Sequence, residues 1–197
     1  MKCANCPQHP VHRCEKEGFD CTGGSLDLTL YQQEPEKSWH RISMDMIHEV
    51  GNTLNRLEEI IEFCQRMKYE RLGIAFCIAL SREAEALSNI LKQYFTVNSV
   101  CCKICGLPKK DFGCGNVNPD PEKFEAMCNP IGQARMLNRN GSDLNIELGL
   151  CLGHDLLFQK YSEAPVTVFA VKDRVMAHNP LGVLYSSFYK GRFKKKK

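Results

Sequence analysis

Two patterns of apolar and polar positions divide this chain. Between residues 39 and 69 apolar side chains recur at helical spacing, and Gly51 separates this stretch into two expected helices. From residue 71 onward, continuous apolar runs of strand length alternate with amphipathic stretches. The expected strands are residues 71–80, 96–102, 143–151 and 164–173. One expected helix begins at Ser81, and the others cover residues 130–141, 154–162 and 179–189.

Capping signals mark the ends of two of these helices. Ser81, followed by Glu83 and Glu85, is typical of an N-cap with an acidic first turn. Pro130 suits the first turn of its helix, and Gly141 suits the end of the same helix. The pattern therefore predicts a strand followed by a helix, repeated along the chain.

Four apolar strands separated by helices are typical of parallel βαβ units with right-handed crossovers. We therefore expect an α/β fold over residues 40–190, a three-layer sandwich with a mainly parallel, Rossmann-like, doubly wound sheet of about four strands. Residues 103–127 form a loop insertion rich in Gly, Pro and Asn. Residues 1–30 form a cysteine-rich lead, and residues 191–197 form a basic tail.

The composition narrows the class of protein. With 197 residues, 43% of them hydrophobic, the chain is long enough for one well-buried core. Its apolar runs are shorter than the roughly 20 residues that span a bilayer, and its start lacks the apolar core of a signal peptide. We therefore expect a cytoplasmic protein without a membrane segment.

The charge of the chain does not favour nucleic-acid binding. Residues 190–197 carry six positive charges and no acid, so the net charge of +3 becomes −3 for the rest of the chain. Elsewhere the sequence contains no extended basic face interleaved with aromatic residues. A small molecule or a partner protein is therefore the expected type of partner.

Twelve cysteines are unusual for a protein in a reducing compartment, where clustered thiols are metal ligands or redox groups more often than disulfides. Cys3, Cys6, Cys14 and Cys21 lie within the lead. Four thiolates can close a tetrahedral shell around zinc or hold an iron–sulfur cluster, and ligation would order a segment with few large apolar residues. The alternative is a CxxC redox pair on a mobile lead.

A second set of candidates follows from the expected sheet, because parallel α/β sheets bind ligands outside the carboxyl ends of their strands. The candidate rim residues are Cys102, Cys128, Cys151, His154 and His178. Thiolate and imidazole suit zinc, copper(I) and iron, so this rim can bind a soft metal or a cluster. Cys128 also precedes a helix, whose dipole stabilises a thiolate.

Some cysteines have a simpler interpretation as packing residues. Free cysteine is among the most buried residue types, which favours packing for Cys64 on a helix face and for Cys77 inside an apolar strand. Cys101 and Cys102 are adjacent, so in an extended strand they point to opposite faces and at most one of them faces the rim.

The motifs "MCNPIGQA", "GLCLGHD" and "KDRVMAHNP" carry a family resemblance. Together with "LGIAFCIAL" and "SVCCK", they resemble DUF1847, a bacterial and archaeal family whose metal binding is inferred from an amino-terminal cysteine cluster. The resemblance extends from Met1 to about Tyr185. It implies metal binding by the lead, and it assigns no catalytic residue.

Three functions remain open from the sequence. The first is a protein that binds zinc or an iron–sulfur cluster and has a thiol-rich pocket at the rim. The second is a cysteine-dependent or redox enzyme, in which Cys128 or Cys151 attacks and His154 or His178 is the base. The third is a small-molecule-binding module with structural zinc. No dinucleotide or P-loop glycine motif follows the first expected strand, so nicotinamide and ATP chemistry by those routes is disfavoured.

Overall fold

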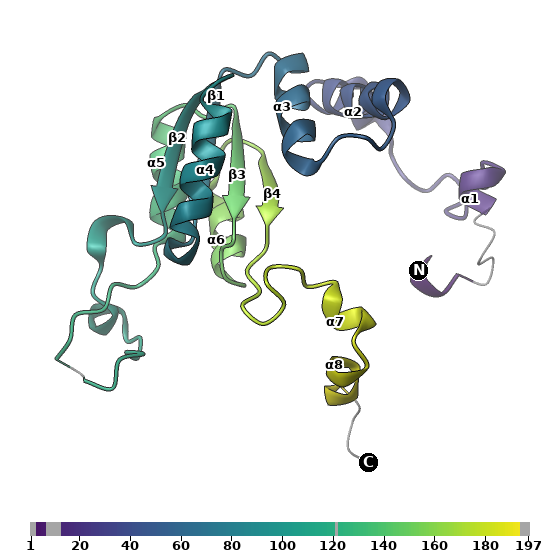
Figure 1. The fold of residues 1–197 in the computed structure, drawn as a ribbon. Helices are drawn as coiled ribbons and strands as arrows, with labels where there is room; N and C mark the ends of the chain where they lie inside the picture. Colours follow the sequence, from purple (N-terminus) through teal and green to yellow (C-terminus); the bar gives the residue numbers. More distant parts are fainter. Residues whose placement is uncertain (1–2, 7–12, 121, 194–197) are drawn as a thin grey trace. The chain divides into compact units, whose positions relative to one another are not determined.

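The computed structural model describes residues 3–6, 13–120 and 122–193 of the chain (Figure 1). The chain divides into two compact units, Met1–Glu49 and Val50–Lys197. The sequence-based division put residues 40–49 in the α/β domain, whereas here they belong to the first unit, which includes most of the first expected helix.

The first unit contains short helical turns and one longer helix. The turns are η1 (Cys3–Asn5), α1 (Arg13–Lys16) and η2 (Thr29–Gln32), followed by helix α2 (Glu36–Val50). The buried side chains of α2 are those of Ile42 and Met46, one helical turn apart. Gly51 follows α2 with a positive φ of 61°, as expected for the residue that divides the helical stretch.

The second unit alternates strands and helices as the sequence predicts. Its first helix begins with a capping box formed by Asn55 and Glu58. The strands are β1 (Arg71–Phe76), β2 (Thr96–Cys101), β3 (Leu144–Leu148) and β4 (Val166–Ala170). The helices are α3 (Arg56–Arg66), α4 (Ser81–Leu91), α5 (Pro130–Arg139), α6 (His154–Tyr161), α7 (Gly182–Tyr185) and α8 (Ser187–Arg192), with 3₁₀ turns η3 (Ile78–Leu80), η4 (Ile104–Gly106) and η5 (Lys109–Phe112).

The four strands form one parallel sheet in the order β2-β1-β3-β4. Phe76 at the end of β1 pairs with Cys101 of β2 and with Leu148 of β3. The strands therefore end together at one side of the sheet, which we call the carboxyl edge (Figure 1). The predicted α/β, Rossmann-like fold is confirmed.

Helices cover both faces of the sheet, which makes the three layers (Figure 1). On one face, Cys64 of α3 and Leu91 of α4 are fully buried against Leu72 and Ile74 of β1. On the other face, Ala134 and Leu137 of α5 and Phe158 of α6 are fully buried in a second core with Ala75 of β1 and Val100 of β2. The packing role expected for Cys64 is confirmed.

Several boundaries differ from the sequence-based expectation. Strand β1 ends at Phe76, because the backbone then turns through η3, while Leu80 remains buried and prolongs the apolar run. Ser81 is the first residue of α4 and not its N-cap, since η3 leads directly into the helix. The final expected helix is two short helices separated at Ser186, whose side chain caps α8. In the described part of the chain, the helices are all too short or too polar to cross a membrane.

Candidate functional site

The order of the strands reverses between β1 and β3, because β2 lies on one side of β1 and β3 lies on the other. This position determines where a crevice can form. After β1 the chain continues into α4 on one face, and after β3 it continues to α6 on the other face. Strands β1 and β3 are neighbours, so the loops that leave them diverge. In open α/β sheets ligands bind at such a switch point.

Three cysteines from three segments meet at this part of the carboxyl edge. Cys77 follows β1, Cys102 follows β2, and Cys128 precedes α5. The Cys128 thiol donates to the Cys102 sulfur across 3.9 Å, and a hydrogen bond between thiols links Cys102 to Cys77. Cys77 and Cys102 are buried, whereas Cys128 is partly exposed. We call these three residues the thiol cluster.

The backbone around β2 explains why only one of two adjacent cysteines joins the cluster. The Cys102 N–H donates to the carbonyl of Phe76 at 2.9 Å, which extends the β1–β2 ladder by one residue. Cys101 accepts a hydrogen bond from the Lys103 backbone and lines a separate pocket of about 390 Å³ along the outer side of β2, while it also packs against the second core. That at most one of the pair faces the rim stays a prediction.

Helix α5 fixes the third thiol against the second. The Asn129 N–H donates to the carbonyl of Cys102 at 2.8 Å, and the Asn129 side chain caps the helix by accepting from Gly132. One turn further along, the buried Gln133 amide donates to the carbonyls of Phe76 and Val100. The start of α5 is therefore tied to the ends of β1 and β2, directly beneath the thiol cluster.

A lysine from the far side of the sheet reaches Cys77. Lys172 follows β4, and its Nζ lies 3.3 Å from the Cys77 Sγ. Gly149 lies beneath its stem: a Cβ there would approach Lys172 Cδ to 4.0 Å and Leu80 Cδ1 to 2.1 Å. Gly149 also has a φ of 65°. Glycine at this position therefore suits both the backbone turn after β3 and the close passage of neighbouring side chains.

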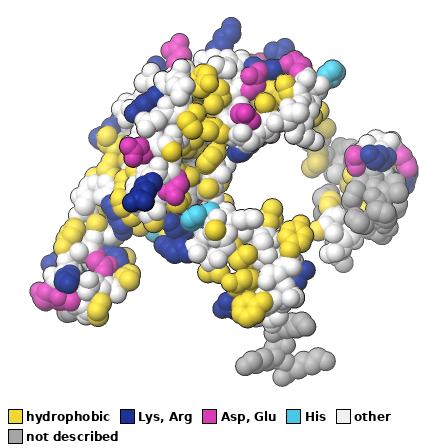
Figure 2. Space-filling view, viewed as in Figure 1, with side chains coloured by type: hydrophobic (Ala, Val, Ile, Leu, Met, Phe, Trp, Pro, Cys, Tyr) yellow, Lys and Arg dark blue, Asp and Glu magenta, His cyan; other side chains and the backbone are white. Residues whose placement is uncertain are grey.

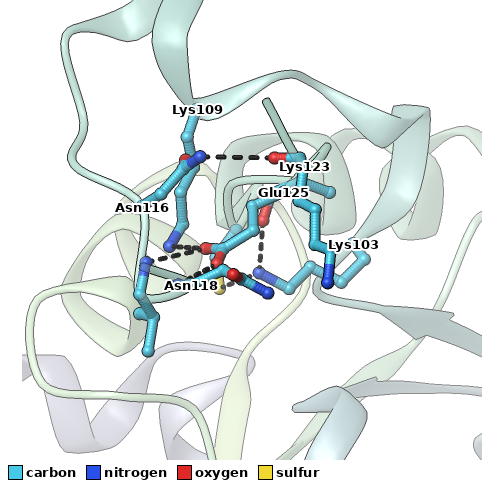
Figure 3. A network of polar contacts seen from close by, with 9 residues as sticks. Lys103, Lys109, Asn116, Asn118, Lys123 and Glu125 are labelled. Carbon is cyan, nitrogen blue, oxygen red and sulfur yellow. Dashed lines mark hydrogen bonds and ion pairs between the residues drawn. The ribbon is translucent and has the colours of Figure 1, made fainter. Parts of the chain in front are cut away.

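A second lysine reaches Cys128. The Lys103 Nζ lies 3.4 Å from the Cys128 Sγ and donates to the carbonyl of Ala126 at 2.7 Å (Figure 3). A third basic side chain, Arg174, approaches Cys151, which follows β3, with an N–S distance of 3.8 Å. Cys77, Cys128 and Cys151 therefore each have a cation beside their sulfur.

The surroundings of Cys77 and Cys102 shift the pKa values of the two thiols in opposite directions. A hydrogen bond from Cys102, aided by the Ala79 N–H and the Lys172 ammonium, lowers the pKa of Cys77 to about 5. Burial opposes this shift. The pKa of Cys102 is raised, first because its proton is held by Cys77 and then because the group is buried. The lowered pKa favours the thiolate form of Cys77, and the raised pKa favours the thiol form of Cys102.

The insertion between β2 and α5 is held together by one carboxylate (Figure 3). Glu125 accepts from the Lys109 ammonium and from the backbone N–H groups of Val117 and Asn118. These contacts, of which the lysine contact is the largest, lower the pKa of Glu125 to about 2. Lys103 lies at the base of the same segment, so the insertion and the thiol cluster share one side chain.

The two candidate histidines take other roles in the structure. His154 is the first residue of α6, and its backbone N–H donates to the Cys151 carbonyl at 2.8 Å. His178 has its Nδ1 3.1 Å from the Asp173 N–H and 3.1 Å from the Val171 carbonyl. Among the described residues, the hydrogen bonds to cysteine sulfur from other side chains come from lysine, arginine and cysteine.

The lead contains the first expected metal site. Cys3, Cys14 and Cys21 are exposed and Cys6 is half-buried. A 3₁₀ turn brings the first two together, since the Cys6 N–H donates to the Cys3 carbonyl at 3.2 Å. Within residues 3–6, 13–120 and 122–193, no three His, Cys, Asp or Glu side chains are grouped so that they could hold a metal ion.

Sequence reasoning identified Cys102 and Cys128 but missed their partners. Cys77 is buried, as the packing interpretation expects, yet its sulfur also contacts Lys172. Its place directly after an apolar strand is a signal that could have included it among the rim residues. No local motif indicates Lys103 or Lys172. Lys103 is 25 residues from Cys128 along the chain, and Lys172 is 95 residues from Cys77.

Comparisons with known proteins identify relatives without a described activity. The model of a family described as a protein of unknown function, DUF1847, matches residues 25–169. An uncharacterized protein of Methanocaldococcus jannaschii is 46% identical over 191 residues, which is 96% of this chain and 96% of the relative. No solved structure matches this chain.

Proposed function

Since this chain belongs to the DUF1847 family, whose description names no function, we propose its function from the geometry of the thiol cluster. We propose that the cluster is a dithiol redox centre in which Cys102 and Cys128 alternate between two thiols and one disulfide. Cys128 is the partly exposed thiol that meets the substrate, and Cys102 is the buried thiol that completes the disulfide.

The observation that carries this proposal is the 3.9 Å contact between the Cys102 and Cys128 sulfurs, with a lysine ammonium beside Cys128. A disulfide needs its sulfurs at about 2.05 Å and its two Cα atoms within about 7 Å. The backbone hydrogen bond between Asn129 and Cys102 keeps the two segments adjacent, so rotation of the side chains can close most of the gap.

Cys77 has a distinct part in this chemistry. Thiol–disulfide exchange needs a thiolate to attack, and Cys102 is held as a thiol by its hydrogen bond to Cys77. As the Cys102 sulfur bonds to Cys128, its proton passes to the Cys77 thiolate, whose charge Lys172 stabilises. Lysine thus takes the place beside the thiols that the sequence-based enzyme hypothesis gave to histidine.

Peptide mapping tests the proposed disulfide. The full-length reduced protein is equilibrated with glutathione redox buffers, quenched by alkylation and digested without reductant. We expect a Cys102–Cys128 linked peptide as the first disulfide to form. The Cys128→Ser variant should lose it, and Cys105→Ser, which removes an exposed thiol outside the cluster, should retain it. Oxidation that leaves Cys102 alkylated would contradict the proposal.

A specific observation in the lead favours a second function, metal binding. The turn that joins Cys3 and Cys6 suits two sulfurs that share one ion, and thiolates at Cys14 and Cys21 would complete a four-sulfur shell. Zinc bound there would order the lead, whereas an iron–sulfur cluster would supply one-electron transfer. The chemistry of these four donors fits either group.

Metal analysis of protein purified without oxygen tests this second function. We expect about one zinc per chain, or iron with acid-labile sulfide and a broad visible absorption band. The paired variant Cys3→Ser/Cys6→Ser should lose the metal, and Cys128→Ser should keep it. Metal content that falls with Cys128→Ser and not with the lead variant would move the metal site to the carboxyl edge.

A further inference from the structure

Basic side chains gather beside the thiols at the carboxyl edge. Lys103 follows β2 and lies against Cys128, while Lys172 and Arg174 follow β4 and lie against Cys77 and Cys151. Arg174 is exposed, and both lysines are partly exposed. Figure 2 shows dark blue side chains over the lower part of the α/β unit, with magenta side chains close to some of them. A substrate that reaches Cys128 therefore meets positive charge first.

The carboxylates of the same loops offset this charge only in part. Asp155 accepts hydrogen bonds from two backbone N–H groups at the start of α6, and Asp173 accepts two more in the turn after β4. Glu147 is buried under the edge, and burial raises its pKa, which favours its uncharged form. The lysines and Arg174 instead direct their nitrogens at sulfur atoms.

We propose that the substrate of the thiol cluster is a disulfide that carries carboxylate or other anionic groups close to its sulfurs. This inference rests on the proposed dithiol redox function and adds the class of substrate. An anionic group would lie beside Lys103, with the substrate sulfur at Cys128, and Arg174 would add positive charge farther along the same edge. A neutral disulfide gains nothing from these cations, and a cationic one is repelled by them.

The reaction balances as a two-electron exchange. The Cys128 sulfur attacks one sulfur of the substrate RSSR, a mixed disulfide forms, and RS⁻ leaves beside the Lys103 ammonium and is protonated to RSH. The Cys102 sulfur then attacks the Cys128 sulfur, the second RS⁻ leaves and is protonated, and the protein disulfide forms. The first RS⁻ takes the proton of the Cys128 thiol, and the second RS⁻ takes the proton of the Cys102 thiol, which reaches it by way of Cys77. The substrate is reduced to two thiols while the protein dithiol is oxidised.

Three disulfides of similar size and different charge test the inference on the full-length protein. They are dithiodipropionate with two carboxylates, hydroxyethyl disulfide with two hydroxyls, and cystamine with two amines. The measured quantity is the rate of Cys102–Cys128 disulfide formation, divided by the rate at which the same compound oxidises a free cysteine derivative. This ratio removes differences in leaving-group chemistry. We expect the dianion to react about tenfold or more faster than the dication, and salt to shrink the difference.

Charge-removing variants provide the second measurement. Lys103→Gln and Arg174→Gln should each lower the preference for the dianion severalfold, whereas Lys160→Gln, a basic side chain near the end of α6, should not. Equal normalised rates for all three compounds would overturn the charge preference and leave the dithiol centre intact. If none of the compounds forms the Cys102–Cys128 disulfide, both the dithiol function and this inference fail.

Discussion

At the scale of single residues, Cys102 is the residue on which the site depends. Its sulfur accepts from the Cys128 thiol at 3.9 Å and from the Ile78 N–H at 3.4 Å, and it shares a hydrogen bond with Cys77. Its proton is shared with Cys77, so the two thiols titrate as a pair and not as independent groups. Over a wide pH range the folded pair holds one proton and one negative charge.

This shared proton predicts how stability depends on pH. The lowered pKa of Cys77, about 5 against an ordinary 9.0, means that between these values the unfolded pair binds one more proton than the folded pair. Stability from Cys77 is therefore fully present above about pH 9 and is lost as the pH falls toward 5. The raised pKa values of Cys102 and of Cys64, the latter about 12, act oppositely, so stability falls as the pH rises beyond about 9.

Urea unfolding of reduced protein between about pH 6 and pH 8 measures this effect. In that window the free energy of unfolding of the wild-type protein should rise with pH, with the slope expected for up to about one bound proton. The same free energy should depend less steeply on pH in Cys77→Ser. Cys105→Ser, which removes an exposed thiol, should keep the wild-type slope. Identical slopes in wild type and Cys77→Ser would show that Cys77 is not a thiolate in the folded protein.

At the scale of elements, the insertion between β2 and α5 behaves as an ordered part of the site. An isolated pairing of Pro108 with Ala126 closes its base, and the Met127 N–H donates to the Leu107 carbonyl at 2.8 Å. Glu125 then gathers three donors from the rest of the segment. Because Cys128 follows this closed base, the insertion helps to set the position of the thiol.

Removing the Glu125 charge should loosen this element. Glu125→Gln loses the ion pair with Lys109, so we expect faster tryptic cleavage at Lys109, Lys110 or Lys123, by about threefold or more. Limited proteolysis followed by mass spectrometry measures the rate. Glu122→Gln, an exposed change in the same segment, is the control. Equal cleavage of both variants would mean that the Glu125 contacts do not hold the insertion.

At the scale of the whole molecule, the parallel sheet makes the site. All four strands end at one edge, so groups far apart along the chain become neighbours, as Cys77 and Lys172 do across 95 residues. The order β2-β1-β3-β4 puts β1 beside the switch point, and the residue that follows it is Cys77. Gly149, which follows β3, leaves room for Leu80, because a Cβ there would lie 2.1 Å from Leu80 Cδ1.

The sequence by itself determined the class of fold and two of the three thiols. Apolar runs such as "LGIAF" and "LNIEL" must be buried on both faces, and the helical stretches between them require crossovers, so a parallel α/β sheet was predictable. Cys102 and Cys128 were predictable because each lies next to an expected strand end or helix start. The Ser81 cap and the single last helix were wrong, because local patterns do not distinguish a strand end from a buried 3₁₀ turn, or one helix from two.

Only the tertiary structure decided the strand order and the pairing of thiols with cations. Hydrophobic periodicity reports which side of an element is buried and carries no information about which strand lies next to which. Whether Lys172 or a histidine lies beside Cys77 depends on the strand order and on the loop lengths. These are properties of long-range contacts, so the chemistry of the carboxyl edge could be read only from the folded chain.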